Sequence, residues 1–357
     1  MKKIVIACDS YKGCLSSSEV SDAVAEGVSE VYPDCEVVRL AVADGGEGTV
    51  EALVDTLGGH LEWAEVSDPL GRPVRAAYGV AGDLAIIESA AACGLALLTN
   101  EGRNPLIATT KGLGELILAA VDKGCRRFLI GLGGSATNDG GMGMIGVEGF
   151  LEKTRGLQFT IACDVDTPYI GKNGASRVFG PQKGASGQDV EVLEERLRGY
   201  ALKISEDTGI DVSDMPGAGA AGGLGGAFRA YLGAELKRGV DLVLDQIGFD
   251  SVIAGADLVI TGEGCSDYQT LKGKTAVGVL ERAERLNIPV ALVSGAVRDE
   301  KMLRDRGFRI VEAVTPPSMS LEEAMRPETA KHLVAVATRN ILHQFCIYYR
   351  VLHMRNH

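Results

Sequence analysis

Short runs of β-branched and aliphatic residues alternate along this chain with segments of helical periodicity, and glycine-rich loops follow several of these runs. The first run, residues 3–7, precedes a capping sequence at 16–19 and a helical segment in which Val24 and Val28 share one face. The next run lies at 36–40. Strand, helix and strand in this order are typical of a parallel sheet with helices on both faces, so the pattern predicts an α/β fold.

The same alternation returns near the C-terminus, where a helix at 275–286 separates two expected strands, 256–260 and 289–294. The middle of the chain is rich in glycine and has strands of its own. These are expected at 84–88, 127–131 and 160–164.

This return of the pattern predicts how the chain is divided into domains. We expect residues 1–65 and 251–357 to form one domain with a parallel sheet, and residues 66–250 to form a second α/β domain inserted in it. A chain of 357 residues is long enough for two such domains.

Charge and composition exclude several classes of partner. The formal net charge is −12 and no dense Lys/Arg cluster is present, which argues against nucleic acid, because phosphate backbones bind to basic surfaces. The eight cysteines are scattered singly, a pattern that favours reduced thiols in a cytoplasmic enzyme. No apolar run approaches the roughly 18 residues of a membrane span, so no membrane partner is expected. An oligomer is possible, and the sequence leaves the number of subunits open.

The segment from Gly131 to Gly141 is rich in glycine and directly follows an apolar run. Its backbone N–H groups can surround an anion, and Ser135, Asn138 and Asp139 add a hydroxyl, an amide and a carboxylate. These features predict a phosphate site. Neither the Walker pattern GxxxxGK[ST] nor a GxGxxG fingerprint with its acidic partner is present. Similar loops lie at 43–49, 216–223 and 261–264.

Polar residues also follow the first two expected strands, at the strand ends where open parallel sheets bind ligands. Lys12 could offset the charge of a substrate acid, with Ser10 beside it, and Asp9 could take a proton or hold a metal. The alternative is a helix-capping turn with a solvated Lys12. Asp44 could bind Mg²⁺ or accept a hydroxyl proton, or it could belong to a turn whose glycines only reverse the chain.

Further candidates lie in the middle and near the C-terminus. Arg103 precedes a helix start that bears threonines and could clamp a carboxylate. Asp164 ends an expected strand, and Lys183 lies in a Gly-Pro turn where its ammonium suits a phosphate. Glu263 and Asp267 are candidates for metal binding or for a general base. A solvated surface loop is the competing interpretation for Asp164 and for Lys183.

The five histidines lie outside all of these glycine loops, which argues against Ser-His-Asp or Cys-His catalysis. Carboxylates, lysines, hydroxyls and glycines remain. They are typical of metal-assisted phosphoryl transfer, in which positioning and charge neutralisation supply most of the rate.

Taken in order, these segments resemble the bacterial glycerate kinase family over nearly the whole chain. The resemblance implies ATP- and Mg²⁺-dependent phosphorylation of D-glycerate, usually at the 2-hydroxyl to give 2-phosphoglycerate. It also implies a flavodoxin-like domain from the chain ends with a distinct α/β domain inserted. The motifs that carry it are 9–13, 43–49, 68–73, 103–106, 131–141, 174–176, 179–185, 216–225 and 262–274.

The resemblance implies roles for individual residues. Lys12 or Arg103 would meet the carboxylate of glycerate, beside Asp9 and Ser10. The base that deprotonates the hydroxyl would be Asp44, Asp164 or Asp267, with Asp164 preferred. Asp139 and Glu263 would bind the metal. The nucleotide would lie near Gly133, Gly134, Ser135, Asn138, Asp139, Lys183, Gly217, Gly219 and Gly222.

The chain departs from the family pattern at three places that bear on activity, and one of them is Cys8 in place of the usual proline, together with an unusual C-terminal tail. The segment 149–156 is shorter than usual, and Cys265 stands where the family has an arginine after Gly-Glu-Gly. A thiol cannot replace an arginine at a phosphate. An impaired or non-catalytic relative that still binds ligand is therefore an alternative, and so is a kinase of another small hydroxy acid.

Overall fold

The computed structural model describes residues 1–46 and 48–355. Contacts within the chain divide it into two compact units, Met1–Asp44 with Val243–His357, and Gly45–Leu242. The first unit is thus built from both chain ends, and the second is a continuous insertion.

At both junctions the border between the units lies at an earlier residue than the sequence predicts. Strand β3 (His60–Ser67) pairs along its whole length with β4 (Pro73–Ala81), so it belongs with the insertion. Helix α10 (Gly239–Gln246) crosses the second border, and α11 (Phe249–Ile253) lies in the first unit. We propose the contact borders as the domain borders.

The first unit holds a five-stranded parallel sheet in the order β13-β11-β9-β1-β2. Counted along the chain this is the order 2-1-3-4-5, which is that of flavodoxin-like folds. The predicted α/β class is therefore confirmed. The strands are β1 (Lys3–Cys8), β2 (Glu36–Ala41), β9 (Leu258–Gly262), β11 (Val290–Ser294) and β13 (Ile310–Ala313).

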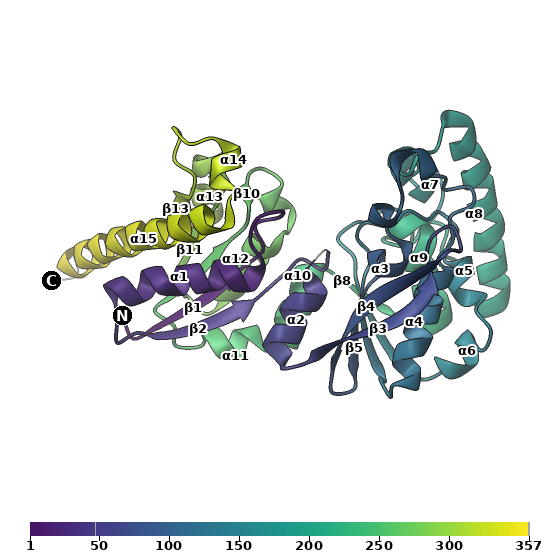
Figure 1. Cartoon of the computed structure of the whole chain (residues 1–357), viewed down its shortest axis with the longest axis horizontal. Coiled ribbons are helices and arrows are strands. Elements are labelled where there is room, and N and C mark those ends of the chain that lie inside the picture. Colours follow the sequence, from purple (N-terminus) through teal and green to yellow (C-terminus); the bar gives the residue numbers. More distant parts are fainter. Residues whose placement is uncertain (47, 356–357) are drawn as a thin grey trace. The chain divides into compact units, whose positions relative to one another are not determined.

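Helices α1 (Ser17–Val31) and α15 (Pro327–Arg355) pack against each other beside this sheet (Figure 1). The expected capping signal is present, because the Ser16 hydroxyl accepts the backbone N–H of Glu19 and the Glu19 carboxylate accepts that of Ser16. Gly27 allows the close packing, since a Cβ there would lie 2.5 Å from a backbone oxygen of α15. The other elements are β10 (Cys265–Ser266), α12 (Thr275–Arg285), β12 (Ala296–Val297), α13 (Glu300–Arg306), α14 (Leu321–Ala324) and the 3₁₀ turn Thr270–Lys272.

The second unit holds a six-stranded mixed sheet in the order β3-β4-β5-β6-β7-β8. Strands β3, β4 and β5 (Leu84–Glu88) pair antiparallel, and β5, β6 (Arg127–Gly131), β7 (Gln158–Ala162) and β8 (Glu235–Lys237) pair parallel. Its helices are α2 (Thr49–Leu57), α3 (Ala90–Cys93), α4 (Lys111–Asp122), α5 (Met142–Ile145), α6 (Phe150–Lys153), α7 (Ala175–Phe179), α8 (Gly187–Thr208) and α9 (Ala220–Leu232), with 3₁₀ turns at Leu95–Leu97, Asn100–Gly102 and Pro181–Lys183.

The short segment 149–156 leaves the sheet continuous. It forms the single turn α6, and Phe150 is buried in the core of the second unit. Strands β6 and β7, on either side of it, pair in register from Arg127 opposite Gln158 to Gly131 opposite Ala162. The shortening therefore exposes no new edge between these strands.

Within the described ranges, none of the helices combines the length and the apolar character that crossing a membrane would demand.

Candidate active site

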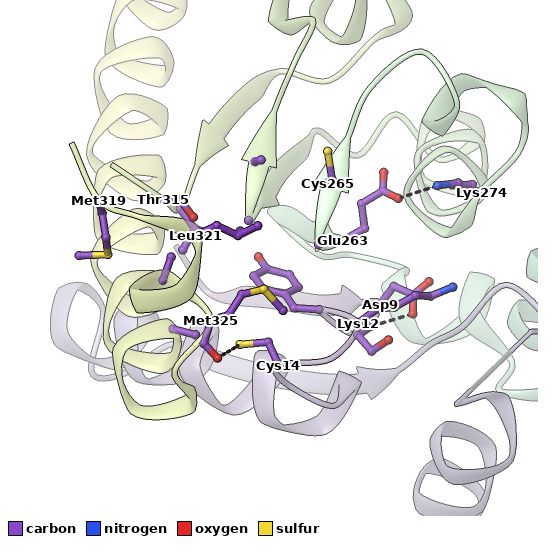
Figure 2. Close-up of a pocket in the computed structure, with 18 of the residues that line it drawn as sticks. Asp9, Lys12, Cys14, Glu263, Cys265, Lys274, Thr315, Met319, Leu321 and Met325 are labelled. Carbon is purple, nitrogen blue, oxygen red and sulfur yellow. Dashed lines mark hydrogen bonds and ion pairs between the residues drawn. The ribbon is translucent and has the colours of Figure 1, made fainter. Parts of the chain in front are cut away.

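The first unit has a cavity of about 470 Å³ lined by residues that follow β1, β9 and β11. Figure 2 shows its polar end, where Asp9, Lys12, Glu263 and Lys274 lie around the strand ends. Asp44, after β2, also lines it. Parallel strands end at this edge of the sheet, so residues far apart in sequence meet where α/β sheets bind ligands.

Asp9 is a deeply buried carboxylate at this end, with 8% of its surface exposed. Its Oδ2 accepts the Thr275 hydroxyl at 2.6 Å, and its Oδ1 accepts the backbone N–H of Ser10 at 2.7 Å. Burial raises the pKa of Asp9 to about 6, and the Thr275 hydrogen bond opposes this shift. A carboxylate with a pKa near neutrality can exchange a proton with a bound hydroxyl at physiological pH.

Glu263 is held by a second group of hydroxyls. Its Oε1 accepts the Thr270 hydroxyl at 2.6 Å and the Ser266 hydroxyl at 2.9 Å, and Oε2 lies 3.8 Å from the ammonium nitrogen of Lys274. Burial raises the pKa of the Glu263 carboxyl. The Ser266 hydroxyl is in turn 2.7 Å from that of Ser294, so the carboxylate is fixed in direction.

The polar end has the groups that Mg²⁺ needs when it arrives with a phosphate. Magnesium in kinase sites is commonly held by one or two carboxylates together with substrate phosphates. Glu263 and Asp9 can supply carboxylate oxygens of this kind. No cluster of three or more His, Cys, Asp or Glu side chains in residues 1–46 and 48–355 could hold a metal by itself.

Two predicted site residues of the first unit differ in their position relative to the cavity. Asp44 lines the cavity, whereas Asp267 is not among its lining residues. The Asp267 carboxylate accepts the backbone N–H of Gln269 at 2.8 Å and shapes the turn that carries Thr270. Cys265, where the family resemblance predicts an arginine, lines the cavity at the start of β10.

The glycine-rich loop of the second unit follows β6 and is built around a buried lysine. Lys183 donates to the Ser135 hydroxyl at 2.9 Å and to the Thr137 carbonyl at 2.6 Å. Burial lowers the pKa of Lys183 to about 7, and the charge of Asp139 opposes the shift. The lysine therefore fixes the loop from within.

Asp139 is saturated with hydrogen bonds from its surroundings. Its Oδ2 accepts the backbone N–H and hydroxyl of Thr110 at 2.7 and 2.9 Å. The Thr109 hydroxyl and the backbone N–H groups of Gly141 and Gly143 also donate to this carboxylate. Because five donors already surround it, Asp139 has less capacity to bind a metal than Glu263.

Asn138 lies where the glycine loops meet. Its amide nitrogen donates to the Ser176 hydroxyl at 3.0 Å, while its Oδ1 is buried with no hydrogen-bond partner. Gly222 lies against it, since a Cβ there would be 2.6 Å from the Asn138 Cα, and the Gly222 carbonyl accepts the N–H of Gly140 at 3.0 Å. Gly219 donates to the Thr167 carbonyl at 2.9 Å. The loops after β6 and β7 and the start of α9 are thus packed together.

The remaining predicted residues of the second unit lie around these loops. Gly217 packs near Cys163. Gly134 has a backbone φ of 73°, which lies in the left-handed region. The Asp164 Oδ1 accepts the backbone N–H of Gly239 at 2.9 Å. Arg103 packs against Gly184, and its Nε is buried without a partner. The predicted site residues therefore form two groups, one in each unit. Asp9, Ser10, Lys12, Asp44, Glu263 and Asp267 lie in the first unit, and Arg103, Gly133, Gly134, Ser135, Asn138, Asp139, Asp164, Lys183, Gly217, Gly219 and Gly222 lie in the second.

The comparison with known families decides the identity of the fold. The profile described as the glycerate kinase family matches residues 4–151 and 145–346. This chain belongs to the glycerate kinase family.

Relatives of known name agree with this. The chain is 43% identical over 353 residues to a glycerate kinase of Bacillus subtilis (strain 168), covering 90% of this chain and 92% of the relative. It is 42% identical over 370 residues to a glycerate 2-kinase of Escherichia coli (strain K12), covering 95% and 97%. A crystal structure of a protein described as glycerate kinase 2 from Salmonella typhimurium LT2 matches with a TM-score of 0.87 and 42% identity, covering 98% of this chain and 99% of that one.

Membership of the glycerate kinase family makes this chain a kinase, as the resemblance predicted. The two stretches that match the family overlap over residues 145–151, which include the start of the short segment 149–156.

Sequence reasoning missed the residues that hold the two buried carboxylates of this cavity. Thr270, Thr275 and Ser266 orient Glu263 and Asp9. The available signal was the group of hydroxyl residues that follows the last glycine loop. The apolar wall of the cavity, supplied by residues 314–330, was also missed because it has no glycine or charge pattern.

Proposed function

We propose that this chain transfers the terminal phosphoryl group of ATP to the 2-hydroxyl of D-glycerate in the cytoplasm, with Mg²⁺, to give 2-phosphoglycerate. The observation that carries the proposal is the family match over residues 4–151 and 145–346. The name of the Escherichia coli relative, glycerate 2-kinase, supports the choice of hydroxyl.

The polar end of the cavity in the first unit supports this chemistry. Lys12 and Lys274 can offset the negative charge of phosphates or of the glycerate carboxylate. Glu263 can bind Mg²⁺ through an oxygen that the two hydroxyls keep in place. When bound, Mg²⁺ neutralises charge on the transferring phosphoryl group.

Four carboxylates are candidates for the base that takes the hydroxyl proton. Asp9, with a pKa of about 6, is the one whose burial prepares it for proton exchange near neutral pH. Asp44 lines the same cavity. Asp164, the choice from sequence, lies in the second unit and is fixed by Gly239, and Asp267 shapes a turn. Replacing each of the four carboxylates in turn by asparagine would rank the candidates. The variant that lacks the true base should lose most of kcat, while its Kd for nucleotide changes little.

The glycine-rich loop of the second unit is proposed to bind phosphate or carboxylate oxygens. Ser135 and the N–H groups of Gly133 and Gly134 are the donors, and Lys183 keeps the loop in shape. Arg103 is proposed to bind the carboxylate of glycerate. A Lys183→Met variant should lose kcat/KM while keeping the overall fold, which circular dichroism would check.

Two alternative functions are also considered, each for a feature of this chain. Cys265 in place of an arginine and the short segment 149–156 support an impaired relative. A kinase of another hydroxy acid would have the same carboxylates and lysines. Turnover of ATP with purified full-length protein, Mg²⁺ and a panel of acids separates these functions.

The panel also tests which hydroxyl reacts. D-lactate keeps only the 2-hydroxyl, and 3-hydroxypropionate keeps only the 3-hydroxyl. We expect ADP release with D-glycerate, weaker release with D-lactate and none with 3-hydroxypropionate. Release with 3-hydroxypropionate alone would contradict the proposed position of phosphorylation.

A further inference from the structure

The polar end accounts for only part of the cavity in the first unit. A three-carbon acid fills a small fraction of about 470 Å³. Pockets of this size, roughly 300–1,000 Å³, usually enclose larger ligands. The rest of the cavity therefore has room for a second, larger occupant.

The wall of this remaining space is apolar. It comes from the segment between β13 and the start of α15, which includes Val314. Figure 2 shows the side chains of Met319, Leu321 and Met325 at this wall. Two of these are unusually exposed for apolar residues, Leu321 at 71% and Met325 at 37%. Large apolar side chains left exposed around a cavity mark a binding surface.

We infer that this apolar wall binds the base of the nucleoside triphosphate, with the phosphate chain extending toward Lys12 and Lys274. The inference rests on the proposed function and adds to it the place of the base. A flat aromatic ring buries area against aliphatic side chains, and the thioethers of Met319 and Met325 suit contact with it.

Charge supports a nucleotide over a purely apolar ligand. The same cavity continues from the apolar wall to two ammonium groups, so its occupant combines a flat apolar part with several negative charges. Asp9, Asp44 and Glu263 lie among these ammonium groups, and they are compatible with a phosphate chain that carries Mg²⁺. A fatty chain would match the wall but not the charged end.

Binding can be tested without turnover. The full-length protein is titrated calorimetrically with the Mg²⁺ complex of a non-hydrolysable ATP analogue, in the absence of glycerate. We expect Leu321→Ser and Met325→Ser each to raise Kd about fivefold, and the double variant to raise it further. Both side chains are exposed, so the melting temperature should stay close to that of the wild type.

The matched control is Leu202→Ser on α8, which removes an apolar side chain of similar exposure, 68%, in the second unit. Its Kd should stay within about twofold of the wild type. In steady state, the wall variants should raise KM for ATP and leave KM for glycerate unchanged.

An unchanged Kd in the double variant would overturn the inference, as would a rise in KM for glycerate alone, which would place the acid at the wall. Absence of analogue binding to the wild type would overturn it too. If the protein binds the analogue and the wall variants weaken binding, but D-glycerate is not phosphorylated, the proposed function fails and the inference stands.

Discussion

Asp9 lies at the end of β1, and we expect the proton affinity of its carboxyl group to change clearly when the chain folds. Burial raises its pKa to about 6, above the ordinary value of about 3.9. Between these two values the folded protein binds more protons at Asp9 than the unfolded chain does. The contribution of Asp9 to stability is therefore present below pH 4 and is lost as the pH rises through 6.

We expect a comparison of the wild type with Asp9→Asn, whose amide cannot ionise, to show this effect. The free energy of unfolding of the wild type minus that of the variant should fall by about 2 kcal/mol between pH 4 and pH 7. Urea unfolding at several pH values measures it. A difference that stays constant with pH would show that the Asp9 carboxyl titrates normally.

We expect Cys265 to limit the activity of this chain. It lines the polar end of the cavity and has no positive charge to offer a phosphate. We expect Cys265→Arg to raise kcat/KM for ATP at least about tenfold, because an arginine binds phosphate oxygens bidentately. Cys265→Ala is the control and should leave kcat/KM close to the wild type. Equal values for all three proteins would mean that the position does not contact the nucleotide.

At the scale of elements, the loop after β6 depends on Lys183. Burial lowers its pKa to about 7, from an ordinary value of about 10.4. Between these values the folded protein binds fewer protons at this site than the unfolded chain, so its contribution to stability rises with pH. It is lost as the pH falls through 7.

We expect the free energy of unfolding of the wild type minus that of Lys183→Met to rise by about 2 kcal/mol from pH 7 to pH 9. The variant also loses the bonds to Ser135 and Thr137, so it should be less stable than the wild type at pH 9. Chemical unfolding at both pH values is the measurement. A difference that stays constant would place the proton on Lys183 throughout this range.

The elements themselves could largely be predicted from the sequence. Strands at 84–88 and 127–131 were expected with the ends that the structure has, because each contains a buried apolar run flanked by charged residues or glycine. The loop 216–223 was expected as irregular, whereas α9 begins at Ala220 with left-handed backbone at Ala221, Gly222 and Gly223. Contacts with the loop after β6 determine that conformation, and the local sequence does not report them.

The candidate site could be predicted only in part. Glycines, carboxylates and lysines at strand ends marked the loops, because their chemistry is visible locally. The hydroxyl of Thr275 on Asp9 joins residues 266 positions apart. Such a partner depends on which strands are neighbours in the sheet. The apolar wall at 314–330 looks like ordinary core sequence until the cavity is known.

At the scale of the whole molecule, the chain consists of two units with separate cores. We expect a chain of residues 45–242 alone to fold cooperatively, because the six-stranded sheet and its helices lie within it. A chain of residues 66–250 should be much less stable, since it lacks nearly all of β3 and exposes the edge of β4. Thermal unfolding of both chains makes the comparison, and equal stability would favour the borders expected from the sequence.

The most direct test of glycerate 2-kinase activity in this chain is ADP release by the purified full-length protein with D-glycerate, ATP and Mg²⁺, with the product identified by NMR. We expect ADP to form only when D-glycerate is present and the product to be 2-phosphoglycerate. A folded protein that binds the ATP analogue but releases no ADP with D-glycerate would contradict the account.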